Sequence, residues 1–310
     1  MKQKPKAATA TASHHGGFKL GRLHRTYDPR IPHLSALLAG QTLTPPPASV
    51  DWTKGMPANL GMMLNGPDPN DPPQAPDGLG DCTCAAVYHA IQVWTFNADN
   101  KMVTQPDSDV EKLYILACGY NPKVPGEGPG GNEQTVLTYW LNKGVPTGPN
   151  GATTEKIAAF VEVGPRNQDD VKRTISDCGV AYIGFNVPQS VMPANQPPPA
   201  VWDYVPNNST IIGGHAVVLA GYNAQGARVI SWGQYYTMTW QFFAHFVDEV
   251  YAIADADWVC QQRHHARRLY PGPTGSADAG AETGLNRRCW ISGLVDLWIN
   301  GVAQCPRQAT

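Results

Sequence analysis

Hydrophobic positions in the first half of the chain repeat with the period of an α-helix. Over residues 82–97, four apolar side chains share one helix face: Cys84, Val87, Ile91 and Trp94. A capping box of Ser108 and Glu111 marks the start of a second helix. This second helix is predicted over residues 108–118. Two further segments, each ending at a glycine, predict helices over residues 132–144 and 167–179.

The pattern changes after residue 179. Four short segments rich in β-branched and aromatic residues are bounded by Gly, Asn or Pro, which is typical of strands: residues 180–187, 215–223, 227–233 and 249–254. Helices therefore come first and strands later. This succession is typical of an α+β protein whose helices and strands form separate layers.

Composition divides the 310-residue chain into three parts. Residues 1–45 are basic and then proline-rich, and they predict a flexible arm with one short helix near residues 34–40. Residues 46–258 carry the periodic segments and predict the folded domain. Residues 259–310 predict a basic linker that ends in a short apolar tail. The 31 glycines and 28 prolines gather in the loops and tails around the folded centre.

Charge and hydropathy exclude several classes of function. The formal net charge of −2 gives no reason to expect nucleic acid or an anionic membrane as a partner. No apolar run reaches the length of about 18 residues that a membrane-spanning helix needs. The N-terminus lacks the apolar core of a signal peptide, so we expect a cytoplasmic protein or a subunit of a larger particle.

The cysteines offer one candidate nucleophile. The seven cysteines are odd in number and irregularly spaced, so they predict no disulfide framework, and Cys-x-Cys is not a zinc-site spacing. Cys84 lies on the apolar helix face and is interpreted as a core residue. Cys82 lies in the first helical turn, where backbone N–H groups and the helix dipole stabilise a thiolate. The alternative is that both cysteines are buried and inert, with Asp81 serving only as the N-cap.

One histidine is placed to serve as the base of such a nucleophile. His215 follows two glycines, opens a predicted strand and lies 133 residues after Cys82. His89 is about 10 Å along the helix from Cys82 and too far for a hydrogen bond. The remaining histidines fall in the arm, in the basic segment or in an aromatic segment: 14, 15, 24, 33, 245, 264 and 265. The paired ones among them are interpreted as tail residues, so no metal site is predicted.

Six motifs in order resemble the papain/cathepsin-like cysteine peptidase family over residues 48–254. They are "SVDWTKG", "LGDCTCAA", "DSDVEKLYILACGYNPKVPGEGPGG", "GGHAVVLAGYN", "VISWGQYYTMTWQFF" and "EVYAI". The resemblance implies a helical subdomain with a long central helix, an antiparallel β-barrel-like subdomain and a cleft between them. It also implies a thiol hydrolase that cleaves peptide or amide bonds in a peptide-like substrate, without a cofactor.

The resemblance also assigns roles to residues. It makes Cys82 the nucleophile and His215 its base, with Trp232 shielding their ion pair from water. Gly130 and Gly131 would present a backbone edge to an extended peptide.

Three departures from the family pattern concern the catalytic groups and their control. Ile230 stands where the family has an asparagine that orients the histidine, so a bulge that presents Ser231, or the side chain of Gln234, would have to replace it. Asn65 or Gln74 would supply the oxyanion-hole amide. Only about 48 residues precede "VDW", too few for the family's inhibitory pro-domain, so we expect another form of control.

Two other functions remain open at this stage. One is a papain-like scaffold with a weak or dead site, serving as a binding or structural subunit of a larger assembly. The arm and the C-terminal tail would then contact protein partners. The other is a transferase with the same thiol chemistry, in which an amine replaces water.

Overall fold

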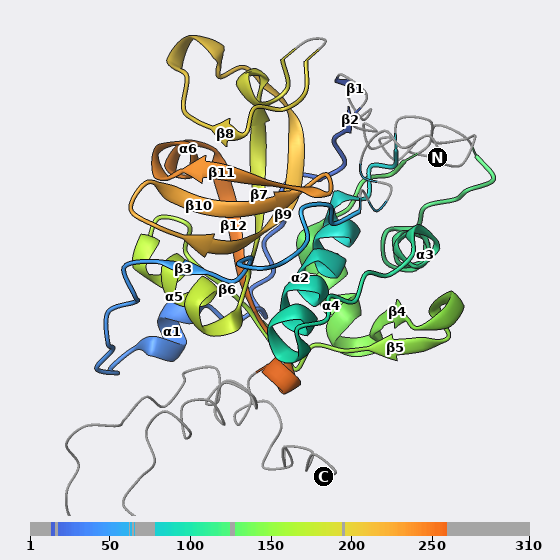
Figure 1. Ribbon diagram of the computed structural model, residues 1–310, viewed down its shortest axis with the longest axis horizontal. Helices are drawn as coiled ribbons and strands as arrows, with labels where there is room; N and C mark the ends of the chain where they lie inside the picture. The colour runs from blue at the N-terminus through green and yellow to red at the C-terminus, as the bar shows by residue number, and fades with distance from the viewer. Residues whose placement is uncertain are drawn as a thin grey trace, which may run out of the picture.

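The computed structural model describes residues 14–15, 18–61, 63, 65, 78–124, 128–193 and 196–258 (Figure 1). Gln74 and residues 259–310 lie outside these ranges, so the oxyanion role of Gln74 and the C-terminal linker and tail stay predictions. Within the described ranges, no helix combines the length and apolarity that crossing a membrane requires.

Four helices form where the hydrophobic period predicts them. They are α2 (Cys82–Asp99), α3 (Asp107–Cys118), α4 (Glu133–Lys143) and α5 (Gln168–Cys178). Asn132 and Asn167 cap α4 and α5 by accepting backbone N–H groups. The predicted Ser108–Glu111 capping box is wrong, because α3 begins at Asp107 and no side chain caps it.

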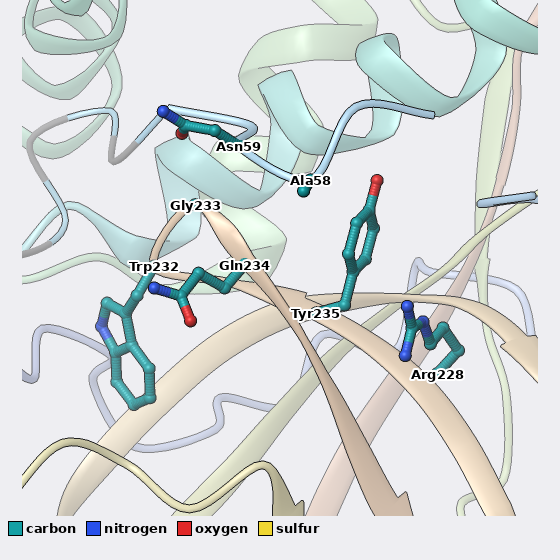
Figure 2. Close-up of a pocket in the computed structure, with 7 residues that line it drawn as sticks. All are labelled: Ala58, Asn59, Arg228, Trp232, Gly233, Gln234 and Tyr235. Carbon is teal, nitrogen blue, oxygen red and sulfur yellow. The ribbon is translucent and has the colours of Figure 1, made fainter. Parts of the chain in front are cut away.

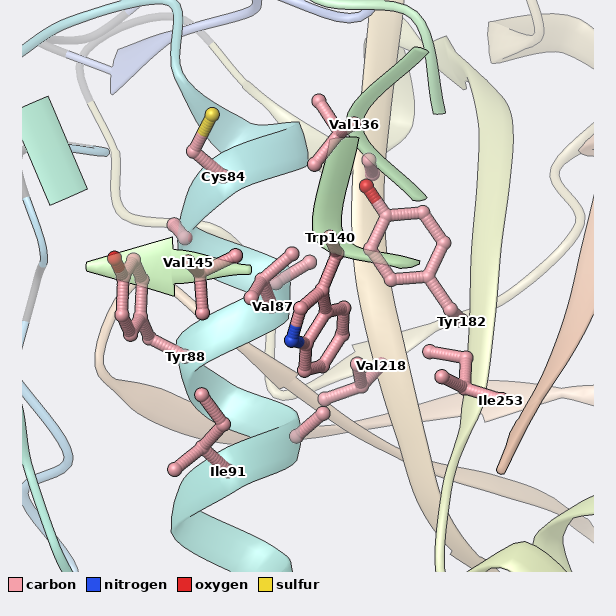
Figure 3. Packing of buried hydrophobic residues seen from close by; sticks show 14 of the residues in the cluster. Cys84, Val87, Tyr88, Ile91, Val136, Trp140, Val145, Tyr182, Val218 and Ile253 are labelled. Carbon is pink, nitrogen blue, oxygen red and sulfur yellow. The ribbon is translucent and has the colours of Figure 1, made fainter. Parts of the chain in front are cut away.

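The central helix α2 is buried around its whole circumference over its first turns, not along one face only. Residues 82–94 are all buried because α3, α4 and the strand β9 (Ile211–Tyr222) pack around them. Figure 3 shows Trp140 of α4 packed between α2 and the strands. A helix that is apolar on nearly all sides belongs in a core, and here that core holds the N-terminus of α2 rigidly in place.

The strands form one large sheet, mostly antiparallel. Its order is β6 (Ala159–Glu162), β12 (Val247–Ala254), β7 (Ala181–Pro188), β9, β10 (Gly226–Ser231), β11 (Gln234–Thr239) and β8 (Val201–Trp202), with β3 (Val50–Asp51) also paired to β9. Only the β11–β8 pair within this sheet is parallel. The α+β class is confirmed. The sheet is not a closed barrel among the described residues, because β6 and β8 remain unpaired with each other.

The remaining elements are short. They are β1 (His14–His15), β2 (Phe18–Lys19), α1 (Leu34–Leu38), β4 (Val145–Thr147), β5 (Thr153–Glu155) and α6 (Trp240–Phe246), with single 3₁₀ turns at Pro149–Gly151, Gln189–Val191 and Pro206–Asn208. β4 and β5 form a small antiparallel pair beside α3 (Figure 1). The short helix predicted near residues 34–40 is present as α1.

The sheet separates two hydrophobic cores. Alternate residues of β9 serve both: Val217 and Leu219 join the core that lies against α5 and α6, whereas Ala216 and Val218 join the core that contains α2. Each face of the strand that carries His215 is therefore fixed by packing. Position 215 has little freedom to rotate from one face to the other.

Part of the segment predicted as a flexible arm is packed into the protein. Leu20, Leu34 and Leu38 are buried and belong to the core on the α5 side of the sheet. We call residues 18–25 the arm segment. In Figure 1 it runs as the dark-blue trace along the junction between the sheet and the helical layer.

Candidate active site

The Cys82 thiol is buried at the N-terminus of α2. Its sulfur accepts backbone N–H groups from Ala216 of β9 and Gly21 of the arm segment. Burial raises the pKa of Cys82 to about 12, and the hydrogen bonds offset this only in part. The thiolate expected from the helix N-terminus is therefore not the resting form. Desolvation therefore outweighs the helix dipole, and the arm segment is one of the neighbours that contact the sulfur.

His215 is held from three sides. Its Nε2 lies 2.7 Å from Ser231 Oγ. The Trp232 ring stacks on the imidazole, with centroids 4.5 Å apart and planes 13° apart, and Phe185 meets the ring edge-on. Burial lowers the pKa of His215 to about 3, so the imidazole is neutral. Its Nδ1 has no hydrogen-bond partner in the described part of the chain.

A one-residue register shift gives Ser231 its position. Arg228 pairs with Gly221, but Val229 pairs with Leu219, so one residue of β9 is left out of the ladder. Because side chains alternate, this shift brings Ser231 to the face of β9 that carries His215. Ile230 turns to the opposite face and packs into the core around α2.

Trp232 reaches the imidazole from a turn and not from the strand. It has a positive φ of 47°, followed by Gly233 at 70°, and these two residues connect β10 to β11. The direction of its side chain is therefore not set by the alternation along β10, and its ring stacks on the His215 imidazole. This contact places the Trp232 ring against His215, and its role in shielding an ion pair stays a prediction.

The N-terminus of α2 packs against β9 close to the position of His215. The backbone N–H that bonds the Cys82 sulfur belongs to Ala216, the residue next to His215. The thiol and the imidazole are not hydrogen-bonded to each other, since Nδ1 has no partner among the described residues and Nε2 bonds Ser231. Both groups are neutral in this arrangement. The ion pair that activates a cysteine nucleophile is therefore not formed while the arm segment is in place.

The arm segment occupies the backbone edge expected to receive a peptide. Gly131 donates its N–H to the Gly21 carbonyl at 2.8 Å and accepts from the Leu23 N–H at 2.8 Å. Arg22 donates its N–H to the Gly214 carbonyl at 3.1 Å. The arm segment therefore contacts both Cys82 and this backbone edge, although no inhibitory pro-domain was expected.

Glycines make room for this bridge. A Cβ at Gly21 would lie 1.9 Å from the Gly80 carbonyl oxygen, and one at Gly130 would lie 2.5 Å from the Gly21 oxygen. Gly214, just before His215, would place a Cβ 2.8 Å from the Arg22 oxygen. The space that two glycines leave beside His215 is thus filled by the arm segment.

Asn65 and Gln234 are two further predicted site residues. Asn65 is buried, and its Oδ1 has no hydrogen-bond partner among the described residues. Gln234 does not bond the imidazole and lines an open hollow of about 730 Å³ beside the Trp232–Gly233 turn (Figure 2). Arg228 and Tyr235 stack on the far side of the same hollow. Of the two candidates for orienting His215, Ser231 makes the contact.

Charged residues that the sequence analysis did not single out lie beside the site. Arg22 is ion-paired to Glu133, Asp248 and Glu249. Glu133 looked like an ordinary acid in the first turn of a helix, and Arg22 like one of many basic arm residues. Asp248 and Glu249 carried the one available signal, since they are two adjacent acids in a strand that is otherwise apolar. The described residues contain no group of three His, Cys, Asp or Glu that could hold a metal.

Cys118, and not Cys82, is expected to react first in the intact protein. Cys118 is partly exposed, whereas the other three described cysteines are buried. A hydrogen bond with Cys84, whose sulfur lies 4.0 Å away, lowers the pKa of Cys118. Brief treatment with iodoacetamide followed by peptide mapping should find Cys118 alkylated before Cys82, Cys84 and Cys178. Equal early labelling of Cys82 would show that the arm segment does not protect the thiol.

Ser231→Ala is expected to lower the hydrolysis rate of a peptide ester by about tenfold, because the imidazole loses the group that fixes its orientation. Ile230→Asn should give no gain, since residue 230 faces away from His215. Initial rates and thermal midpoints are measured together for both variants. A rate increase in Ile230→Asn would contradict the observed register.

Comparison with solved structures identifies the fold. Xylellain, a cysteine protease from Xylella fastidiosa, superposes with a TM-score of 0.55 at 17% identity, covering 78% of this chain and 98% of that one. A digestive procathepsin L 3 from Tenebrio molitor larval midgut gives a TM-score of 0.48 at 12% identity, covering 74% and 75% of the two chains.

The likeness to xylellain shows that the chain has a papain-like fold. No family model matches the sequence, and no curated protein matches it either.

Proposed function

We propose that this protein is a thiol hydrolase that cleaves peptide or amide bonds through Cys82 and His215. The observation that carries the proposal is the arrangement around the imidazole. Ser231 holds Nε2, Trp232 covers one ring face, and Nδ1 is left unbonded next to the segment that contacts Cys82. An oriented histidine with one free nitrogen beside a helix-terminal cysteine is suited to nucleophilic catalysis.

The reaction begins when the arm segment leaves the site. Water and substrate then reach Cys82, the desolvation that raises the thiol pKa is relieved, and His215 takes the proton from sulfur. The sulfur attacks the substrate carbonyl carbon, and the helix N-terminus stabilises the oxyanion together with an amide from Asn65 or Gln74. His215 returns the proton to the departing amine. Water then hydrolyses the thioester and restores the thiol.

The seated arm segment supports a peptide as substrate. Gly131 already binds a backbone through both its N–H and its carbonyl, and Gly214 accepts a third hydrogen bond. Main-chain bonds of this kind recognise any extended peptide irrespective of its side chains. A substrate that replaces the arm segment would gain the same bonds.

Acyl-enzyme trapping tests the proposal. The protein is incubated with a panel of activated peptide esters, quenched in acid and analysed by intact mass and peptide mapping. We expect one acyl adduct, on Cys82, that disappears with time as the ester is turned over. A complete absence of both adduct and turnover across the panel, including in a variant with a displaced arm segment, would contradict the proposal and favour a binding scaffold.

A further inference from the structure

The arm segment inserts one side chain deep into the protein beside the site. The Arg22 guanidinium is 1% exposed and contacts three carboxylates: Nε lies 2.6 Å from Glu133 Oε1, and Nη2 lies 2.7 Å from both Asp248 Oδ1 and Glu249 Oε2. Glu133 and Glu249 are fully buried, and Asp248 is 37% exposed. We call these three acids and the space that Arg22 fills the guanidinium pocket.

The pocket is shaped for this group. Gly184 of β7 forms its wall, and a Cβ there would lie 1.9 Å from Glu133 Oε1 and 2.3 Å from Arg22 Nε. Asn186 donates to Asp248 Oδ2 at 3.0 Å, and the Tyr251 hydroxyl donates to Glu249. Asp248 and Glu249 are thus held by neighbours that do not belong to the arm segment. The pocket is built into α4, β7 and β12.

The buried acids of the guanidinium pocket require a positively charged partner. Burial raises the pKa of Glu133 well above its ordinary value, and Arg22 counteracts this. Burial would lower the pKa of Arg22, but attraction to Glu133 and Asp248 and the bond to Glu249 raise it overall. Removing the cation leaves two buried carboxylates side by side, an arrangement that is costly without a partner. The pocket therefore strongly favours a cationic occupant.

Geometry selects a guanidinium among cations. The carboxylates approach two different nitrogens: Glu133 accepts from Nε, whereas Asp248 and Glu249 both accept from Nη2. A planar guanidinium presents donors in this fork, whereas a lysine ammonium is a single point charge that cannot span the same acceptors. A neutral isostere such as citrulline has similar shape but leaves the carboxylates uncompensated.

The pocket lies next to the candidate nucleophile. The residue before Arg22, Gly21, donates its N–H to the Cys82 sulfur, and the Arg22 backbone bonds Gly214 beside His215. Resting on the proposed function, we propose that the guanidinium pocket is a specificity site and that the substrates are peptides with an arginine close to the cleaved bond. The substrate arginine replaces Arg22 when the arm segment leaves.

Binding to the full-length Arg22→Ala variant tests the pocket without requiring catalysis. The probes are the Nα-acetyl N-methylamides of arginine, citrulline and lysine, and the readout is the shift of thermal midpoint with probe concentration. The arginine probe should bind at least tenfold more tightly than either of the others. Adding Glu249→Gln should remove this preference. Arg30→Ala, which breaks an exposed ion pair of the same N-terminal segment with Asp28, is the matched control and should not respond.

Equal responses to the arginine and citrulline probes, or none, would overturn the proposal. If Arg22→Ala does not fold, the refolding yield with each probe is measured instead. Recovery with arginine but not citrulline supports the pocket, and recovery with neither contradicts it.

A parallel assay separates the two proposals. The substrates are fluorogenic dipeptide amides that carry arginine or citrulline at one of the two residues before the amide. Their hydrolysis by the Arg22→Ala variant is measured. Hydrolysis without a preference for arginine contradicts the proposal that the guanidinium pocket is a specificity site, and it supports the proposal that the protein is a thiol hydrolase. Arginine-selective stabilisation without hydrolysis of any substrate supports arginine binding in the guanidinium pocket and contradicts the thiol-hydrolase function.

Discussion

Replacing Gly21 by alanine is expected to raise the alkylation rate of Cys82 about a hundredfold. The new Cβ would lie 1.9 Å from the Gly80 carbonyl oxygen, so one of the two segments must move. Gly80 adjoins the buried start of α2, whereas the arm segment is a single extended strand of chain held by backbone hydrogen bonds, the ion pairs of Arg22 and the packing of Leu20. The arm segment therefore yields. If the substitution lowers the docking free energy of the arm segment by about 2.8 kcal/mol, the equilibrium between the docked and the open form shifts a hundredfold toward the open form.

The pH profile of alkylation gives a second readout for Gly21→Ala. With the arm segment seated, burial holds the pKa of Cys82 at about 12 and that of His215 at about 3. Opening hydrates both groups, which lowers the first value and raises the second. Alkylation of Cys82 should consequently become appreciable near neutral pH. The control is Gly164→Ala, where a Cβ meets nothing within 4 Å; a similar acceleration there would show that the effect is not local.

Replacing Cys82 by alanine is expected to reduce peptide-ester hydrolysis by at least about a thousandfold, because the nucleophile is lost while the substrate cleft stays intact. Cys84→Ala is the matched control, since Cys84 is also buried in α2 but faces Cys118. It should retain most of the rate at the same protein stability. Both variants are best measured in the Gly21→Ala background, where the site is open. Activity that survives Cys82→Ala but not Cys84→Ala would reverse the assignment of the two cysteines.

Local sequence patterns predicted the helices α2 to α5 and the strands β7, β9, β10 and β12, because each carries its own signal. The bounds of α2 to α5 follow from apolar spacing and from caps such as Asn132 and Asn167. The α+β class follows from their succession. The sheet expected to be barrel-like is open among the described residues, because β6 and β8 are not paired with each other, and no local pattern encodes such a pairing. Ser231 was predicted through a bulge, and the register shift that aims it at His215 is present.

The protonation of Cys82 and the burial of Arg22 were less predictable from the sequence. The helix N-terminus suggested a thiolate at Cys82, but the pKa of a thiol depends on solvent access, and that is set here by a segment 61 residues earlier in the chain. Arg22 lies in a basic, proline-rich stretch whose composition suggests flexibility. Its burial results from acids contributed by α4 and β12, far away in sequence. Contacts of this kind leave no periodic pattern.

The ion pairs of Arg22 also bear on the order in which the protein folds. They join residues separated by 226 and 227 positions, and their acceptors on β12 are in place only once the sheet has assembled around α2. Because closing so long a loop costs entropy before any contact repays it, docking of the arm segment is expected to be a late step. The reverse of a late step is a local opening that leaves the rest of the protein folded. We therefore expect the native protein to sample, without global unfolding, a form in which Cys82 meets solvent.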